Sequence, residues 1–338
     1  MTERALGQNH IYKHFKNAIA TGKLSHAYIL HGERGMGKLN IAKEVAKAIQ
    51  CESNAPEKAD KTGEACGQCK SCHQAESDNQ PDIKYVVPAK KTLGVDDIRE
   101  QINDDALIKP YGSPYKIYII PKSDTMTVQA QNALLKTIEE PPNYAIFILL
   151  AANTDVFLPT IISRCVVLNA RTVGENEIVG ALKEKYSVGD YDAKVAASFA
   201  GGNIGKAEKL ISSDSFKESK DSVTDLVREV ANGGMEVIAK AVKDLNDYKD
   251  DKEALGDYLD MIRVWFGDVL KYKSTKDVNE LVFQESLSEI KQLADHISFE
   301  NLNGIMEEIN NAEGRTKSNV GFDSNMEVML LGIKERLQ

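Results

Sequence analysis

Over the first 170 residues, short apolar runs alternate with stretches whose apolar residues recur at helical spacing. Five of the apolar runs have the length of strands, and they cover residues 27–30, 83–87, 117–120, 145–151 and 165–168. The stretches at 39–50, 95–104 and 128–139 predict helices. Because apolar strands that alternate with amphipathic helices are typical of buried parallel sheets, this region predicts an α/β domain, a five-stranded parallel sheet with helices on both faces.

Beyond Arg171 no further run predicts a strand. The remainder predicts helices that break at glycines, namely at Gly201 and Gly202, at Gly233 and Gly234, and at Gly314. Several apolar side chains recur at helical spacing and are expected to pack within a helical core: Leu259, Ile262, Trp265, Phe266 and Val269. We therefore predict an α/β domain over residues 1–170, a small helical domain over 171–213 and an all-α domain over 214–338.

The composition is that of a globular protein, since 42% of the 338 residues are apolar and 28% are charged. This balance excludes a wholly disordered chain. The longest unbroken apolar run, residues 145–152, is less than half as long as a membrane span requires. The first ten residues contain no apolar stretch, so we expect no secretory signal and a cytoplasmic protein that has no membrane partner.

Charge is distributed unevenly along the chain, whose formal net charge is −9. Residues 215–338 contain 16 basic and 25 acidic side chains, whereas residues 1–214 contain 26 of each. A surface that binds nucleic acid is usually basic. Any direct contact with DNA is therefore expected to be local and N-terminal, or to be made by a partner protein.

Four of the five cysteines fall within 22 residues, as Cys51, Cys66, Cys69 and Cys72, and the fifth is Cys165. In a reducing compartment, thiols at C-x14-C-x2-C-x2-C spacing indicate a metal site before they indicate disulfides. Four thiolates favour zinc, and a closed shell of four ligands is structural rather than catalytic. A redox C-x-x-C pair and a chance grouping of thiols are the alternatives.

A glycine-rich segment, HGERGMGKLN over residues 31–40, lies between a predicted strand and a predicted helix. This is the context of a phosphate-binding loop, in which backbone N–H groups, a helix N-terminus and a lysine surround phosphates. Gly32, Gly37 and Lys38 fit the pattern. Leu39, however, stands where a Ser or Thr hydroxyl would hold Mg²⁺, so the match is incomplete.

A second departure from NTPase chemistry lies at the end of the strand predicted over 117–120. NTPases place acidic residues there, and these residues hold Mg²⁺ and orient water. This strand is followed instead by Pro121 and Lys122. Because two independent metal-holding positions are lost, we expect a domain that keeps the fold without hydrolysing nucleotide.

The segment PTIISRC places Arg164 directly before the last predicted strand. A lone arginine is most simply a solvated charge or a helix-end contact. Its other interpretation is an arginine finger, which stabilises charge on ATP that a neighbouring subunit binds.

Several segments together resemble bacterial clamp-loader subunits, the AAA+ proteins of the DNA polymerase III holoenzyme. In the order and spacing of that family they are GQNHIYKHFKNAIATGKLSHAYILHGERGMGK (7–38), the cysteine loop, QNALLKTIEEPP (131–142) and TIISRC (160–165). The resemblance is to the delta-prime branch rather than to the tau/gamma ATPases. It continues weakly to SNVGFDSNMEVMLLGI (318–333), which is similar to the end of the family's collar domain.

The resemblance implies an AAA+ module with a zinc-loop insertion at 51–72, a helical lid over 171–213 and an α-helical collar over 214–338. It implies zinc on the four clustered cysteines and a degenerate phosphate loop of Gly32, Gly35, Gly37 and Lys38, with nucleotide binding weak or absent. Asn153 matches the sensor residue of the fourth strand. Gly205, followed by Lys206, stands in place of a second-sensor arginine, and Arg164 matches the finger.

The partners that the resemblance implies are delta and three tau/gamma subunits in an open hetero-pentamer. Through that complex, the sliding clamp and primed DNA are implied as well. The chain itself is expected to have no intrinsic ATPase activity and to act as a subunit of a DNA-directed DNA polymerase holoenzyme. Two alternatives stay open at this point: an active ATPase of the tau/gamma type and a zinc-ribbon protein that binds nucleic acid.

Overall fold

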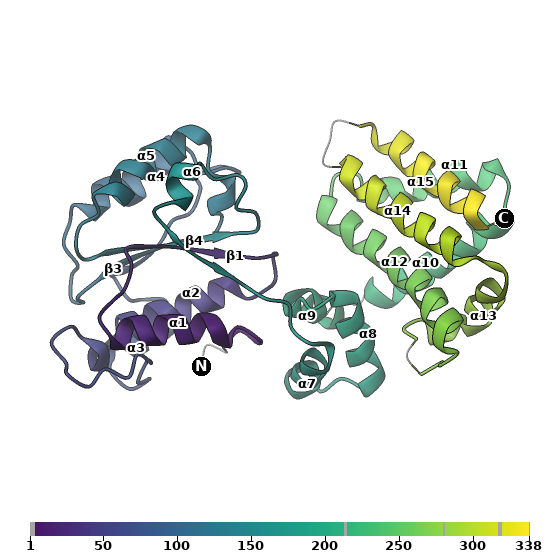
Figure 1. Cartoon of the computed structure of the whole chain (residues 1–338). Coiled ribbons are helices and arrows are strands. Elements are labelled where there is room, and N and C mark those ends of the chain that lie inside the picture. The colour runs from purple at the N-terminus through teal and green to yellow at the C-terminus, as the bar shows by residue number, and fades with distance from the viewer. Residues whose placement is uncertain (1–3, 213–214, 280, 317–319, 338) are drawn as a thin grey trace. The chain divides into compact units, whose positions relative to one another are not determined.

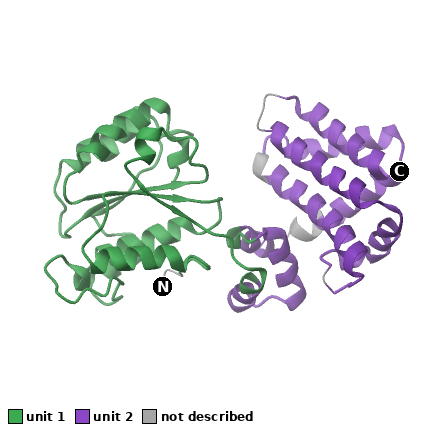
Figure 2. Ribbon diagram, in the orientation of Figure 1, with its two compact units in different colours: residues 1–178, 202–205 green, residues 179–201, 206–338 purple. Residues whose placement is uncertain are grey.

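Two compact units make up the computed structural model, which describes residues 4–212, 215–279, 281–316 and 320–337 (Figure 2). Unit 1 comprises residues 1–178 and 202–205, and unit 2 comprises residues 179–201 and 206–338. Residues 213 and 214, at the second predicted boundary, and residues 318 and 319 of the collar-like segment lie outside the described part. The division into three domains at 170 and 213 stays a prediction.

The described residues of unit 1 form one five-stranded parallel sheet with the order β2-β3-β4-β1-β5 (Figure 1). The strands are β1 (Ala27–His31), β2 (Ile83–Tyr85), β3 (Lys116–Ile120), β4 (Ala145–Ala151) and β5 (Val166–Asn169). The predicted parallel sheet is thus confirmed. The strand ends differ from the prediction by one or two residues: β1 ends one residue later, β3 begins one residue earlier, β2 ends two residues earlier and β5 is displaced by one residue. An apolar run indicates that a strand exists better than it indicates the residues at which the strand begins and ends.

Side chains of each central strand alternate between two apolar cores, one on each face of the sheet. Along β4, Phe147 and Leu149 belong to one core, and Ile146 and Ile148 to the other. On the first face lie α4 (Val95–Ile98) with the π-helical turn η2 (Arg99–Asp104), α5 (Val128–Glu139) and α6 (Pro159–Ile162). On the second face lie α1 (Asn9–Ala20) and α2 (Lys38–Ile49). Helices therefore cover both faces, as Figure 1 shows.

Local chemistry fixes where the helices next to the candidate sites begin. The hydroxyl of Thr127 accepts the N–H of Ala130 at 3.2 Å and caps α5. Gly37 precedes α2 with φ +73°, a left-handed conformation that favours glycine. Cys69 precedes α3 (Lys70–Glu76), and its sulfur accepts the N–H of Cys72 at 3.4 Å. A candidate site therefore lies at the start of α2 and another at the start of α3.

The rest of the described chain is helical. Its helices are α7 (Glu175–Tyr186), α8 (Asp190–Ala200), α9 (Ile204–Ser212), α10 (Ser215–Asn232), α11 (Met235–Leu245), α12 (Lys252–Thr275), α13 (Leu287–His296), α14 (Phe299–Thr316) and α15 (Phe322–Leu337). One apolar core joins α8 and α10 to α15, with Trp265 and Phe266 of α12 buried at its centre, as predicted. None of the described helices combines the length and apolar character that crossing a membrane requires.

The predicted break at Gly314 is wrong, whereas helices do end at the two glycine pairs. Helix α14 continues through Gly314 to Thr316, whose hydroxyl donates to the carbonyl of Glu313 at 2.6 Å. Asn325 of α15 also donates to the carbonyl of Ala312 at 2.8 Å. A glycine costs a helix only about 1 kcal/mol, which the packing of α14 against α15 offsets.

Candidate functional site

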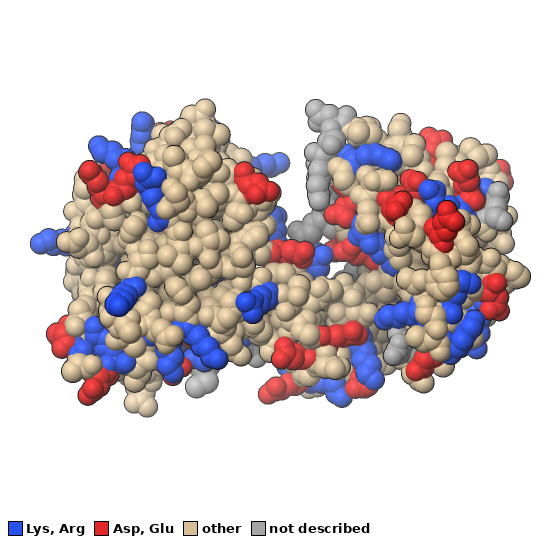
Figure 3. All heavy atoms as spheres, in the orientation of Figure 1, with Lys and Arg blue, Asp and Glu red and all other residues tan. Residues whose placement is uncertain are grey.

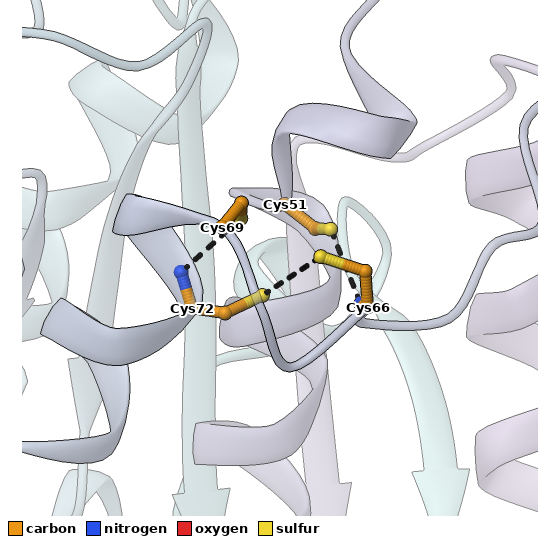
Figure 4. A group of neighbouring side chains, drawn as sticks. All are labelled: Cys51, Cys66, Cys69 and Cys72. Carbon is orange, nitrogen blue, oxygen red and sulfur yellow. Dashed lines mark hydrogen bonds between the residues drawn. The ribbon is translucent and has the colours of Figure 1, made fainter.

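The four clustered cysteines converge in the cysteine loop, residues 51–72, which follows α2 (Figure 4). Their sulfur atoms all lie within 4.8 Å of one another, and the Sγ atoms of Cys66 and Cys72 are 4.0 Å apart. Cys51 and Cys72 are buried, Cys69 is half-buried and Cys66 is exposed. The structure therefore brings together the four residues that their spacing predicted.

The donor set fits a four-coordinate metal with thiolate ligands. Sulfur atoms at the corners of a tetrahedron with metal–sulfur distances of about 2.3 Å are about 3.8 Å apart, close to the spacing observed here. Backbone N–H groups already point at the sulfurs: Cys66 donates to Cys51 at 3.3 Å and Gln68 donates to Cys66 at 3.5 Å. The Gln68 N–H is the main cause that lowers the pKa of Cys66 to about 6, while burial raises the pKa of Cys72.

Buried polar contacts fasten the cysteine loop to the helices beside it. The side chain of Asn54, 3% exposed, donates to the carbonyls of Ala48 and Glu64 at 2.9 Å and accepts the N–H of Gly63 at 3.1 Å. Gly63 has φ +74°, and a Cβ there would collide with the carbonyl of Lys16 in α1. These contacts place the middle of the loop against α1 and α2, while the four sulfurs from its two ends lie together.

The phosphate loop, residues 32–38, lies between β1 and α2, as predicted. Gly35 and Gly37 have φ of +90° and +73°. The ammonium of Lys38 folds back and donates to the carbonyls of Gly32 and Glu33, the latter at 2.6 Å. Burial lowers the pKa of Lys38. The loop therefore has two glycines in left-handed conformations, and its lysine is bound to the loop's own carbonyls.

Residues 203–205 bind the phosphate loop directly. Asn203, 1% exposed, donates to the carbonyl of Arg34 at 2.6 Å, and the N–H of Gly205 donates to the carbonyl of Gly35 at 3.1 Å. A Cβ on Gly205 would lie 2.5 Å from that carbonyl oxygen and 2.7 Å from the Cα of Gly35. The position that matches a second-sensor arginine therefore has no room for a side chain. Lys206, the next residue, pairs with Asp260 at 3.3 Å.

Replacing Gly205 with alanine is expected to lower the free energy of unfolding of unit 1 by about 1–3 kcal/mol, because the new Cβ meets backbone atoms that cannot rotate away. Urea unfolding measures the loss, and hydrogen exchange should localise it to residues 32–38. Gly180→Ala is the matched control, since a Cβ at that helical glycine meets nothing within 4 Å. Equal stability of Gly205→Ala and the unaltered protein would contradict the close packing.

An acidic residue that the sequence reasoning missed, Asp124, lies four residues beyond the end of β3. Pro121 and Lys122 follow the strand as predicted, but Asp124 lies in the 3-10 turn η3 (Ser123–Thr125) and its charge raises the pKa of Lys38 against the effect of burial. One oxygen of Asp124 accepts the N–H of Ala152 at 3.0 Å. Asn153, the predicted sensor residue, accepts the N–H of Asp155 at 2.8 Å within its own turn.

Arg164 lies in the turn between α6 and β5, and its guanidinium makes one ion pair and two hydrogen bonds. It pairs with Glu139 at the end of α5 at 2.9 Å, and it donates to the carbonyl of Thr160 at 3.0 Å and the hydroxyl of Ser163 at 3.3 Å. The two charged side chains are 37% and 47% exposed, and exposed pairs of this kind contribute only about 0–1 kcal/mol to stability. Glu139, like Asn203 and Asp124, was not selected from the sequence.

Two family models and the curated relatives match this chain to subunits of DNA polymerase III. A family model described as "DNA polymerase III, delta subunit" matches residues 7–173, and a second, "DNA polymerase III, delta subunit, C terminal", matches residues 236–333. DNA polymerase III subunit delta′ of Bacillus subtilis is 28% identical over 331 residues, which cover 97% of this chain and 96% of that protein.

Relatives of the tau and gamma type are longer than this chain. Subunit tau of Bacillus subtilis is 31% identical over 93% of this chain and 58% of its own length, and subunit gamma of Buchnera aphidicola is 33% identical over 61% and 56%. The chain thus spans somewhat more than half of these relatives. A solved gamma subunit-related protein from Thermotoga maritima covers 97% of this chain and 100% of its own, at 19% identity and a TM-score of 0.43.

Proposed function

The chain belongs to the delta and delta-prime subunit family of DNA polymerase III, and we propose that it acts as a delta-prime-like, non-hydrolysing subunit of the clamp loader. In this role it assembles with delta and tau/gamma subunits in a hetero-pentamer that places the sliding clamp on primed DNA. The likeness to the delta′ subunit along nearly the whole of both chains supports this assignment. We assign it to the cytoplasm, with a lid over residues 171–213 and a collar over 214–338.

One asymmetry carries the proposal. The groups that ATP hydrolysis within the chain would need are missing, since Leu39 follows Lys38 and Pro121–Lys122 follow β3. The group that would act on a neighbour's ATP, Arg164, is present and more than one-third exposed. A subunit that has lost catalysis in cis but supplies an arginine in trans has this combination of residues.

We further propose that the metal of the cysteine loop is zinc, held by Cys51, Cys66, Cys69 and Cys72. Zinc prefers four thiolates in a tetrahedron, and the closed shell makes its role structural. It would link the start of the loop, after α2, to the start of α3. The loop is expected to become a rigid extension of the surface formed by α1 and α2.

The isolated chain is expected to hydrolyse ATP negligibly, because the Mg²⁺-holding hydroxyl and the acidic strand end are both absent. Steady-state phosphate release by the purified chain measures this, with a Lys38→Ala variant as control for contaminating ATPases. Leu39→Thr should not restore activity, since it returns only one of the two missing groups. Turnover that is lost in Lys38→Ala would contradict the proposal.

Asp124 is the observation that favours the competing function, an ATPase of the tau/gamma type. Its charge acts on Lys38, although one of its oxygens is bound to the N–H of Ala152. If the chain does hydrolyse ATP, Asp124→Asn should abolish that activity together with Lys38→Ala. Loss of turnover in both variants would replace the non-hydrolysing assignment with the ATPase.

A zinc-ribbon protein that binds nucleic acid is less well supported. The cysteine loop carries Lys58, Lys61 and Lys70 beside an excess of acidic residues: Glu52, Glu57, Asp60 and Glu64. Unit 2 does not contain the cysteine loop, and on its face drawn in Figure 3 acidic and basic side chains are intermingled. DNA binding by the isolated chain that weakens steeply with salt would favour this function instead.

A further inference from the structure

Glu139 is the last residue of α5, and its carboxylate meets the guanidinium of Arg164 at 2.9 Å. The other two acceptors, the Thr160 carbonyl and the Ser163 hydroxyl, belong to the turn that carries Arg164 itself. Glu139 is thus the contact that joins the arginine to a separate element. Helix α5 is firmly placed, because Ala130, Leu134 and Ile138 are buried in the core on this face of the sheet.

The geometry leaves the arginine able to bind a further anion. A guanidinium carries five N–H donors in one plane, and the two observed hydrogen bonds, both from Nη1, use two of them. The ion pair of Nη2 with Glu139 restrains the group on one side, and donors outside the two hydrogen bonds are left for a further anion. Since the pair is too exposed to contribute much to folding, stabilising the fold does not account for it.

We propose that Glu139 is a positioning residue that holds the Arg164 guanidinium ready for the phosphate groups of a nucleotide bound by a neighbouring subunit. The inference rests on the proposed function, because it gives Arg164 the role of a finger. A free arginine samples many rotamers, and these must be lost each time it meets a phosphate. An arginine that Glu139 already orients loses less freedom at that step, so more of its interaction is available to the transition state.

The test uses the complex reconstituted from this chain with its delta and tau/gamma subunits, and it measures clamp- and DNA-stimulated ATP hydrolysis. Glu139→Ala is expected to lower kcat about threefold to tenfold and to leave the KM for ATP unchanged, because orientation rather than nucleotide binding is lost. Glu139→Gln should recover only part of the rate, since its amide oxygen occupies the same position but lacks the charge of the ion pair. Glu140→Ala, at the adjacent exposed carboxylate, is the matched control and should behave like the unaltered chain.

The double variant separates positioning from an independent effect. If Glu139 acts through Arg164, adding Glu139→Ala to Arg164→Ala should change nothing further. A rate in Glu139→Ala that is unchanged or higher, while Arg164→Ala is slow, would overturn the positioning role and leave the finger in place. If Glu139→Ala lowers the rate of the Arg164→Ala complex by the same factor as it lowers the rate of the unaltered complex, the positioning role is overturned as well. If Arg164→Ala does not change the rate, Arg164 is not an arginine finger and Glu139 has no positioning role. Thermal unfolding and pull-down of each variant show whether folding and assembly are intact.

Discussion

Chelating the metal is expected to release about one equivalent of zinc per chain and to unfold the cysteine loop while the sheet stays folded. Binding to four thiolates contributes about 10–16 kcal/mol in small zinc domains, so its loss should dominate the stability of residues 51–72. The sheet has its own cores on both faces, which contain no cysteine of the cluster. Elemental analysis measures the metal, and hydrogen exchange measures which segment opens.

Single substitutions sharpen this test. Cys69→Ser removes one ligand from the cluster and should lower the zinc content sharply and open the loop. Cys165→Ser is the matched control, because this cysteine lies outside the cluster and burial raises the pKa of its thiol to about 12. Disulfides among the four clustered cysteines in freshly reduced, metal-free protein would contradict the zinc site. Equal zinc loss in both variants would do so too.

The sequence predicts the sheet well because its physical signal is local. Strands of a parallel sheet that is covered on both faces appear as unbroken apolar runs, and all seven residues of β4 are buried. The prediction from sequence is wrong where the structure depends on contacts between segments that are distant in the chain. The ends of the strands depend on where pairing with the neighbouring strands stops, and Gly314 stays helical because α15 packs beside α14. Neither feature leaves a periodic trace in the chain.

The same distinction explains which site residues were found. The four cysteines, which are a rare residue type, and the glycines of the phosphate loop each lie close together in sequence at a characteristic spacing. Asn203 meets the phosphate loop from about 170 positions away, and Glu139 meets Arg164 across 25 positions. The sequence around a single polar residue does not indicate which distant residue its side chain contacts. Contacts of this kind can be identified only once the fold brings the segments together.

Replacing Arg164 with alanine is expected to depress ATP-driven clamp loading by the reconstituted complex and to leave the chain folded. Charge develops on the phosphate oxygens during phosphoryl transfer, and a guanidinium offsets it with paired, planar hydrogen bonds. At the ATP site that borders this chain, the rate of ATP hydrolysis is expected to fall by about 10³-fold. The complex as a whole should lose less in steady-state hydrolysis, because other ATP sites do not border Arg164.

Three comparisons make the Arg164 result specific. Arg164→Lys should recover little, because an ammonium keeps the charge and loses the fork of donors. Arg171→Ala, at an exposed arginine just beyond β5, should load clamps like the unaltered chain. Zinc content and thermal unfolding of Arg164→Ala should match the unaltered protein, since the Glu139 pair is exposed and contributes little to stability. If the Arg164→Ala complex assembles, hydrolyses ATP and loads clamps at the unaltered rate, Arg164 is a surface charge and the trans-acting role is wrong.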